Sequence, residues 1–436
     1  MNNIIFHIDV NSAFLSWSAI HMLENGYEKD IREIPSIIGG DESSRHGIVL
    51  AKSILAKSYG IITGEPIVNA KRKCPNLAVY PSDHNLYKEK SKAMIDYLKT
   101  LTSDIEQVSI DECFLFYTPI SSNYKSPIDA ATQIKDTIFE KFGFTVNIGI
   151  SDKKVLAKMA SDFKKPNLVH TLYQSEIREK MWPLPVADLF GCGKASANTL
   201  KKLGIHTIGD LANTTPEILH SHLKSYGEVL WQYANGIDDS IVNPVQAEAK
   251  GVGNSHTLSK DATTKEEAFK VLLTLADSVA TRLRKTDKYA SMVSLEIKYS
   301  DFRQFSHQCS LKEPSNVSAV IYQTACNLFD ELWDNSPIRL LGIRTSKLVD
   351  TSEPTQLSLF DFIEEQNNIA KEKQNSQKLT NLENALDKIR EKYGKNAIVR
   401  GSNLKNCRPD SELNCAVEPP DYHHKDKVLI DVYKKV

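Results

Sequence analysis

The 436-residue sequence has no long apolar run, few cysteines and no internal repeat. No run approaches the roughly 20 apolar residues that a membrane-spanning helix needs, which argues against a membrane protein. Met1-Asn2-Asn3 leads directly into an apolar stretch, so we expect no signal peptide. The seven cysteines are scattered and odd in number, so we expect a reduced, cytoplasmic protein rather than a disulfide framework.

The chain also lacks a surplus of charge of either sign. Its 54 Lys and Arg residues face 55 Asp and Glu residues, and the net charge of −1 gives no bulk argument for nucleic-acid binding. A binding surface depends on where charge lies, so this class is not excluded. The hydrophobic content of 41% is ordinary for a globular protein. The length exceeds what one hydrophobic core usually serves, which predicts several domains.

Acidic residues occur within one apolar stretch and directly after another. Asp111 and Glu112 lie inside the apolar run 109–116, and Asp9 follows the expected strand 4–8. Neighbouring strand residues point to opposite faces, so Asp111 and Glu112 can serve one site only at a bend or hairpin tip. A solvated turn is the alternative interpretation of an isolated Asp-Glu pair.

Two apolar strands that end in acids can bring Asp9, Asp111 and Glu112 into one cleft. Carboxylates grouped without nearby cations are typical ligands of hard divalent metals. Two such ions about 3.5–4 Å apart can activate a 3′-hydroxyl group and stabilise a departing pyrophosphate. The acids therefore indicate metal-dependent chemistry on a phosphate ester.

The segment His7 to Phe14, together with Ser109 to Glu112, resembles the palm of the Y-family translesion DNA polymerases, the bacterial DNA polymerase IV and V group. Further matches follow in the family's order over most of residues 1–360. The resemblance implies an α+β, multidomain right-hand polymerase with a palm, fingers, a helical thumb containing a helix-hairpin-helix, and an α/β little finger.

The resemblance also implies the composition of the catalytic site. Asp9 and Asp111 would bridge two Mg²⁺ ions, and Glu112 would complete the site on the nucleophile side. The backbone carbonyl of Val10 would add a further metal ligand.

The expected domain boundaries follow the same order. The polar segment 243–250 contains one proline and is typical of a linker. The resulting division is a palm of residues 1–12 and 83–172, fingers at 13–82, a thumb at 173–242, the linker at 243–250, a little finger at 251–350 and a C-terminal tail at 351–436.

Three residues are candidates for contacts with the incoming nucleotide. Phe14 by itself suits a hydrophobic core, but the resemblance implies a steric gate against a ribose 2′-hydroxyl. Lys165, in Lys-Pro-Asn, could be an ordinary solvated helix end, and the resemblance implies contact with the β- and γ-phosphates. Lys57 matches a triphosphate-binding position that is often arginine, and lysine lacks the bidentate fork. Ile54 departs from the tyrosine of many polymerase IV-like members, toward the polymerase V-like pattern.

Residues 189–194 have the spacing of a helix-hairpin-helix turn. Gly191 and Gly193 carry no side-chain bulk, which lets backbone N–H groups approach a phosphate at a helix N-terminus. Lys194 adds attraction that does not depend on base sequence. A turn of this kind contacts the DNA backbone and not the bases.

The polar tail contains one short apolar island, which could be a simple packing segment. Gln356, Leu357, Leu359 and Phe360 resemble the peptide by which bacterial polymerases bind the β sliding clamp. A helix with apolar residues at helical spacing is expected at 379–393. We expect no zinc site from Cys407, Cys415, His423 and His424, because no C-x-x-C spacing is present.

The sequence therefore predicts template-directed addition of deoxynucleoside triphosphates to the 3′ end of a primer on template DNA. By resemblance, synthesis would have low fidelity, cross damaged bases and be tethered by the clamp. One alternative is a catalytically silent DNA- and clamp-binding adaptor, which would have lost the acids. Another is a nucleotidyl cyclase-like enzyme with a similar palm, against which the thumb motif and the clamp-like peptide argue.

Overall fold

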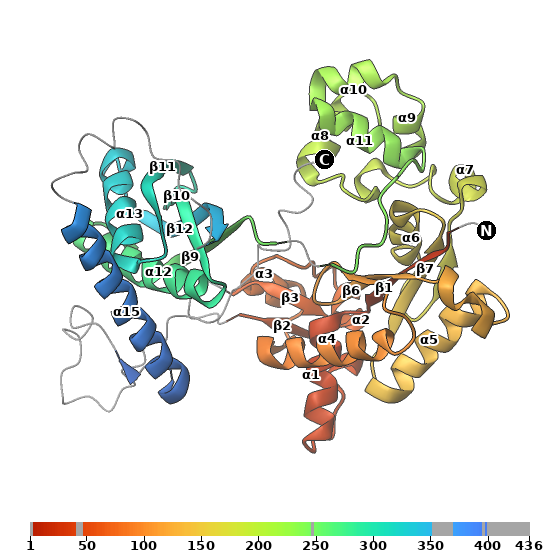
Figure 1. The fold of residues 1–436 in the computed structure, drawn as a ribbon. Coiled ribbons are helices and arrows are strands. Elements are labelled where there is room, and N and C mark those ends of the chain that lie inside the picture. Colours follow the sequence, from red (N-terminus) through yellow and green to blue (C-terminus); the bar gives the residue numbers. More distant parts are fainter. Residues whose placement is uncertain (1–2, 41–46, 246–247, 351–368, 395–396, 399–436) are drawn as a thin grey trace. The chain divides into compact units, whose positions relative to one another are not determined.

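The structure is a computed structural model that describes residues 3–40, 47–245, 248–350, 369–394 and 397–398. The described residues form two compact units, 3–245 and 248–398, and each is considered by itself (Figure 1). The clamp-like peptide at 356–360 and the Cys and His residues at 407–424 lie outside the described residues. None of the described helices is long and apolar enough to span a membrane.

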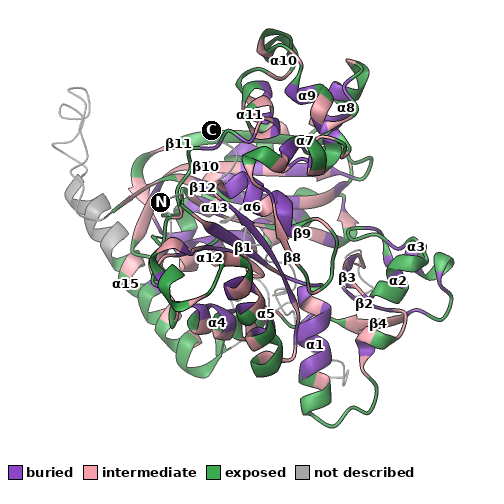
Figure 2. Cartoon of the chain, turned by 90° about the vertical axis from the view of Figure 1, so that its right-hand side faces the viewer, coloured by how far each residue is buried: buried purple, intermediate pink, exposed green. Residues whose placement is uncertain are grey.

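The first unit is built on a five-stranded sheet in the order β5-β6-β1-β7-β8. The central strand β1 pairs antiparallel with β6 and β7, while β7 and β8 are parallel. Nearly all of β1 is buried, as a continuous apolar strand in the middle of a covered sheet should be (Figure 2). The strands are β1 (Ile5–Val10), β5 (Ile105–Gln107), β6 (Glu112–Phe116), β7 (Val146–Ser151) and β8 (Val169–Thr171).

Four main helices accompany this sheet. Helix α5 illustrates how the sequence sets their limits: Ser126 caps its first turn, Pro127 occupies the first helical position, and Gly143 ends it with a φ of 73°. The helices are α1 (Ala13–Glu24), α4 (His84–Lys99), α5 (Pro127–Phe142) and α6 (Lys154–Ser161), with the short 3-10 helix η2 (Thr118–Asn123).

Residues 31–81 add a three-stranded sheet in the order β3-β2-β4. Ser53 joins β2 to α2, because its hydroxyl accepts hydrogen bonds from the N–H groups of Ser36 and Ala56. The elements are η1 (Ile31–Glu33), β2 (Ser36–Gly39), β3 (Val49–Lys52), α2 (Ile54–Ser58), α3 (Ile67–Lys73) and β4 (Ala78–Pro81).

Residues 174–234 are helical. Thr207 and Asp210 form a capping box at the start of α9. The elements are η3 (Gln174–Glu176), α7 (Ile177–Lys180), η4 (Val186–Asp188), α8 (Lys194–Lys202), α9 (Ile208–Ala212), α10 (Pro216–Leu223) and α11 (Ser225–Ala234).

The second unit contains a four-stranded antiparallel sheet in the order β11-β10-β12-β9. It consists of two β-α-β units, β9-α12-β10 and β11-α13-β12. The edge strand β11 is exposed and has few apolar residues. The elements are β9 (Gly251–Ala262), α12 (Lys265–Lys285), β10 (Lys288–Tyr299), β11 (Gln304–Ser315), α13 (Ser318–Leu332) and β12 (Ile338–Asp350).

The helix expected at 379–393 is present as part of the longer α15 (Ile369–Tyr393), but polar contacts hold it on the second unit. Glu383 is buried, whereas four of the apolar side chains are exposed: Leu379, Leu382, Ile389 and Tyr393. Arg284 of α12 pairs with Glu383 and, at 2.6 Å, with Asp387. Glu383 also accepts a 3.1 Å hydrogen bond from the N–H group of Ser318, at the start of α13.

We predict that Glu383→Ala releases α15 from the second unit. Glu383→Ala removes one of the two carboxylates that pair with the buried Arg284 side chain. Leaving a buried charge wholly uncompensated costs roughly 3–5 kcal/mol, and the remaining pair with Asp387 reduces this cost. Amide hydrogen exchange in residues 378–393 should therefore accelerate at least about tenfold, which corresponds to only about 1.4 kcal/mol. The matched control is Glu391→Ala on the exposed side of the same helix. Equal exchange in both variants would contradict the prediction.

Candidate active site

The three acids meet where β1 ends beside the tip of the β5–β6 hairpin. Asp9 lies opposite Glu112 in the register of β1 and β6. The N–H group of Val10 donates a 3.0 Å hydrogen bond to the carbonyl oxygen of Asp111. Glu112 begins β6 and Asp111 lies in the bend just before it, so these neighbouring residues escape strict strand alternation.

Two lysines from the segment that follows β7 neutralise part of this negative charge. The Nζ atom of Lys158, on α6, lies 2.6 Å from Glu112 Oε2 and 3.4 Å from Asp9 Oδ2. The Nζ atom of Lys165 lies 2.9 Å from Asp9 Oδ1, on a more exposed side chain. Lys165 is a predicted site residue, whereas the sequence analysis did not single out Lys158.

The Lys-Pro-Asn segment is held against the end of β1 by buried amides. Asn11 Oδ1 accepts a 2.9 Å hydrogen bond from the N–H group of Asn167. Asn11 Nδ2 donates to Asn147 Oδ1 at 3.2 Å, and Asn147 Nδ2 donates to the carbonyl oxygen of Lys164 at 3.0 Å. These hydrogen bonds position Lys165 beside Asp9, although Lys165 belongs to no helix or strand.

Neighbouring Asp111 and Glu112 have opposite electrostatic environments. Burial would raise the pKa of Glu112, but a hydrogen bond with His7 and the charge of Lys158 outweigh burial and lower this pKa to about 2. Burial raises the pKa of Asp111, and the charges of Asp9 and Glu112 raise it further against the hydrogen bond from Ser109. That bond, from Ser109 Oγ to Asp111 Oδ1, is 2.6 Å long.

His7 is a second residue that the sequence analysis missed. It is fully buried beneath Glu112, with Nδ1 2.8 Å from Ser161 Oγ and Nε2 3.4 Å from Glu112 Oε2. Burial lowers the pKa of His7. The position of His7 as a polar residue inside an otherwise apolar strand is the sequence feature that could have indicated a role.

Phe14 is fixed in an aromatic cluster at the start of α1. Its ring stacks on Tyr87, with a centroid distance of 4.4 Å and an interplanar angle of 8°. It also meets the edge of His84, with a centroid distance of 5.9 Å. This packing gives the half-buried Phe14 ring a defined orientation.

Lys57 is not joined to the acids. It lies on α2 and, in the part of the chain that the structure describes, makes no ion pair with Asp9, Asp111 or Glu112. Burial, and then the nearby charge of Lys57, lower the pKa of Lys52. Lys52, at the end of β3, and Lys57, on α2, therefore lie close enough to affect each other and form a positive region.

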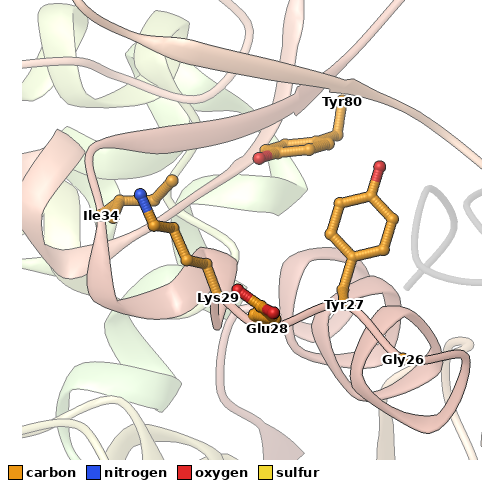
Figure 3. Close-up of a pocket in the computed structure, with 6 residues that line it drawn as sticks. All are labelled: Gly26, Tyr27, Glu28, Lys29, Ile34 and Tyr80. Atoms are coloured by element: carbon orange, nitrogen blue, oxygen red, sulfur yellow. The ribbon is translucent and has the colours of Figure 1, made fainter.

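A hollow of about 480 Å³ lies elsewhere on the first unit, and Figure 3 shows its lining. It includes Tyr27 and Tyr80 but none of the acids or lysines of the cluster described above. The lining residues are Gly26, Tyr27, Glu28, Lys29, Ile34 and Tyr80.

The glycine-rich turn begins helix α8. Gly191 has a φ of 83°, which disfavours other residues, and its carbonyl oxygen accepts a 2.7 Å hydrogen bond from the Tyr226 hydroxyl. Gly193 is the N-cap residue and Lys194 is the first helical residue. A Cβ atom on Gly193 would meet nothing within 4 Å, so the backbone here is open.

Comparison with known proteins follows the same segments. The family model described as impB/mucB/samB matches residues 8–162, and the model of its C-terminal domain matches residues 249–359. A protein named DNA polymerase IV from Clostridium acetobutylicum is 46% identical over 400 residues, which cover 92% of this chain and 98% of that protein. The chain belongs to the Y family of DNA polymerases.

Other relatives of this Y-family chain carry related names. DNA polymerase IV 1 of Bacillus subtilis strain 168 is 37% identical over 93% of this chain and 94% of the relative. A solved Y-family DNA polymerase chimera has a TM-score of 0.69 and 22% identity, and covers 80% of this chain and 99% of its own. The chimera shows the likeness of fold.

Membership of the Y family implies a reaction that depends on a divalent metal. The donor atoms of the three acids suit such an ion, because carboxylate oxygens are the preferred ligands of hard cations. Their convergence on a single ammonium group shows that one cation can contact two of them. Among the described residues, no group of three acidic, histidine or cysteine side chains is already arranged as a metal cage.

We predict that Glu112 stabilises the fold above pH 4.5 and loses this contribution as the pH falls toward 2. A folded-state pKa of about 2, against an ordinary 4.5, corresponds to roughly 3 kcal/mol when Glu112 is fully ionised. Urea unfolding should show the stability difference between wild type and Glu112→Gln shrinking by about 1 kcal/mol from pH 7 to pH 3.5.

The control for this pH dependence is Glu89→Gln, at an exposed position of α4. Its stability difference from wild type should stay nearly constant over the same pH range. A constant difference for Glu112→Gln as well would contradict the ion-pair interpretation.

Proposed function

We propose that this Y-family protein adds deoxynucleoside triphosphates to a primer 3′ end through a site built on Asp9, Asp111 and Glu112. Family membership makes the chain a translesion-type, DNA-directed DNA polymerase. The convergence of three carboxylates at one end of the β1–β6 pair is the observation that carries the assignment of these residues.

Asp9, Asp111 and Glu112, together with the carbonyl oxygen of Val10, would hold two Mg²⁺ ions at this site. When bound, such ions lower the pKa of a primer hydroxyl and neutralise charge on the leaving pyrophosphate. The chain's own residues orient the carboxylates, through the Val10–Asp111 backbone bond and the Ser109–Asp111 hydrogen bond.

Three residues are proposed to handle the nucleotide. Lys165 lies beside Asp9 and would turn its ammonium group toward the triphosphate, as transferring phosphoryl groups require. Lys57, on α2, would add a second positive charge beside the triphosphate once the nucleotide is bound. The stacked ring of Phe14 would block a ribose 2′-hydroxyl, and its packing on Tyr87 supports a rigid role.

Contacts with DNA and with the clamp are assigned to separate segments. Gly191, Gly193 and Lys194 lead into α8, and the backbone at Gly193 is open, which suits a phosphate of the primer-template. The segment 356–360 is proposed to bind the β sliding clamp through Gln356, Leu357, Leu359 and Phe360. These partners and the DNA substrate suit a cytoplasmic place of action.

The competing functions explain fewer of the observations. A catalytically silent adaptor would not need three partly buried acids, two of them paired with lysines, and relatives named DNA polymerase IV do not favour it. A nucleotidyl cyclase could use the same acids but would have no use for a helix-hairpin-helix. Formation of a cyclic nucleotide in place of an extended primer would favour the cyclase.

The decisive test is primer extension in Mg²⁺ on undamaged templates and on templates with an abasic site. Wild type should extend both, and Asp111→Asn should lower the rate at least about a hundredfold by removing a proposed metal ligand. Asp136→Asn, an exposed change on α5, is the matched control. Stalling of the wild type at the lesion would remove bypass of that lesion, and activity of Asp111→Asn would remove the residue's role.

The clamp proposal is tested by the double variant Leu359→Ala and Phe360→Ala. Removing two apolar anchors should abolish stimulation of primer extension by the β clamp, because such anchors carry much of a peptide's binding energy. Synthesis without clamp should stay at the wild-type rate. Stimulation equal to that of wild type would show that the clamp binds elsewhere.

A further inference from the structure

We propose that Lys158 is a resident counter-cation of the carboxylate cluster and competes with a divalent metal ion for Glu112 and Asp9. The inference rests on the proposed function, because it assumes that these two acids are metal ligands. It adds a residue that tunes how readily the site takes up its metal. No role for Lys158 follows from the Lys-Pro-Asn motif, which contains Lys165 instead.

The position of Lys158 is the first support. Its Nζ atom contacts one oxygen from each of two acids, at 2.6 Å from Glu112 and 3.4 Å from Asp9. A third carboxylate, Asp162 of the next helical turn, lies 3.4 Å away. A metal ion ligated by Glu112 Oε2 and Asp9 Oδ2 would occupy the space of this ammonium group, so the two cations exclude each other.

Burial explains why the metal-free chain needs a cation here. The Lys158 side chain is 12% exposed, and those of Asp9 and Glu112 are 16% and 20% exposed. Unpaired carboxylates are costly in such surroundings. The pKa of Lys158 is raised, because the charges of Glu112, Asp9 and Asp162 overcome the opposing effect of burial.

Helix packing keeps Lys158 at the cluster. Helix α6 lies directly on β7, where a Cβ atom at Gly149 would come within 2.0 Å of the carbonyl oxygen of Ala157. Most neighbours of Lys158 on α6 are buried, including Ala157 and Met159. The helix backbone cannot move easily, but the four-carbon lysine stem can swing its ammonium group away when a metal ion arrives.

The proposal predicts opposite effects on two properties. Without Lys158, the metal-free carboxylates repel each other and the fold loses stability. The same loss removes the competitor, so metal affinity rises. A purely structural lysine would lower stability and either weaken metal binding or leave it unchanged.

The experiment titrates Mn²⁺ into the full chain without DNA or nucleotide and measures free Mn²⁺ by electron paramagnetic resonance. We expect Lys158→Gln to lower the dissociation constant for Mn²⁺ at least about threefold, because one competing positive charge is gone. Thermal unfolding should show a lower Tm without metal and a larger rise in Tm on adding Mn²⁺ than in wild type.

Two further variants control for charge and for folding. Lys164→Gln removes an exposed lysine from the neighbouring segment and should keep the wild-type affinity. Lys158→Arg keeps the charge and can bind carboxylates in a bidentate manner, so it should weaken Mn²⁺ binding. Lys158→Arg decides the question if Lys158→Gln does not fold.

The outcomes separate this inference from the proposed function. Unchanged or weaker Mn²⁺ binding by Lys158→Gln, with weakened binding by Asp111→Asn, would overturn the competition and leave the metal site intact. Equal Mn²⁺ binding by wild type and Asp111→Asn, with Asp111→Asn also active in primer extension, would overturn the metal site and the competition together.

Discussion

The proposed active site requires three partly buried carboxylates to lie close together, which their mutual repulsion opposes. The antiparallel register of β1 and β6 sets Asp9 opposite Glu112, and the Val10–Asp111 backbone bond adds the third acid. Hydrogen bonds of the sheet therefore work against electrostatics, and the lysines that follow β7 offset part of the cost. Sheet, hairpin tip and lysine segment have to form together for the cluster to exist.

The lysine segment in turn depends on close packing that leaves little freedom. Gly149 lets α6 approach β7 to backbone contact, and any larger residue would push α6 and Lys158 outward. Asn147 and Asn11 then join the end of the sheet to the Lys-Pro-Asn segment through side-chain hydrogen bonds. Positions without direct chemistry thus determine where two positive charges lie relative to the acids.

The sequence predicted the parts of this arrangement that follow from local pattern. An acid after an apolar strand and an Asp-Glu pair at a bend led to Asp9, Asp111 and Glu112. His7 and Lys158 were missed because each lies among apolar neighbours, where strand or helix periodicity predicts only core. His7 contacts Ser161 and Lys158 contacts Glu112, and each partner is far away in the sequence. Likewise, the pattern of 379–393 predicted a helix but not the residue that attaches it. Glu383 is that buried residue, and its partners are Arg284 and Ser318.

The different pKa shifts of Asp111 and Glu112 show how the remaining charge is distributed. Lys158 pairs with Glu112 and Asp9, Lys165 pairs with Asp9, and both lysines also pair with Asp162, whereas none of the ion pairs that the structure describes reaches Asp111. Glu112 has Lys158 and His7 beside it, and its pKa is lowered; Asp111 has only the Ser109 hydroxyl against burial and two negative neighbours, and its pKa is raised. Added positive charge would therefore stabilise ionised Asp111 most. A divalent ion that displaces Lys158 supplies one more charge than it removes, and this difference suits the acid that the lysines leave unpaired.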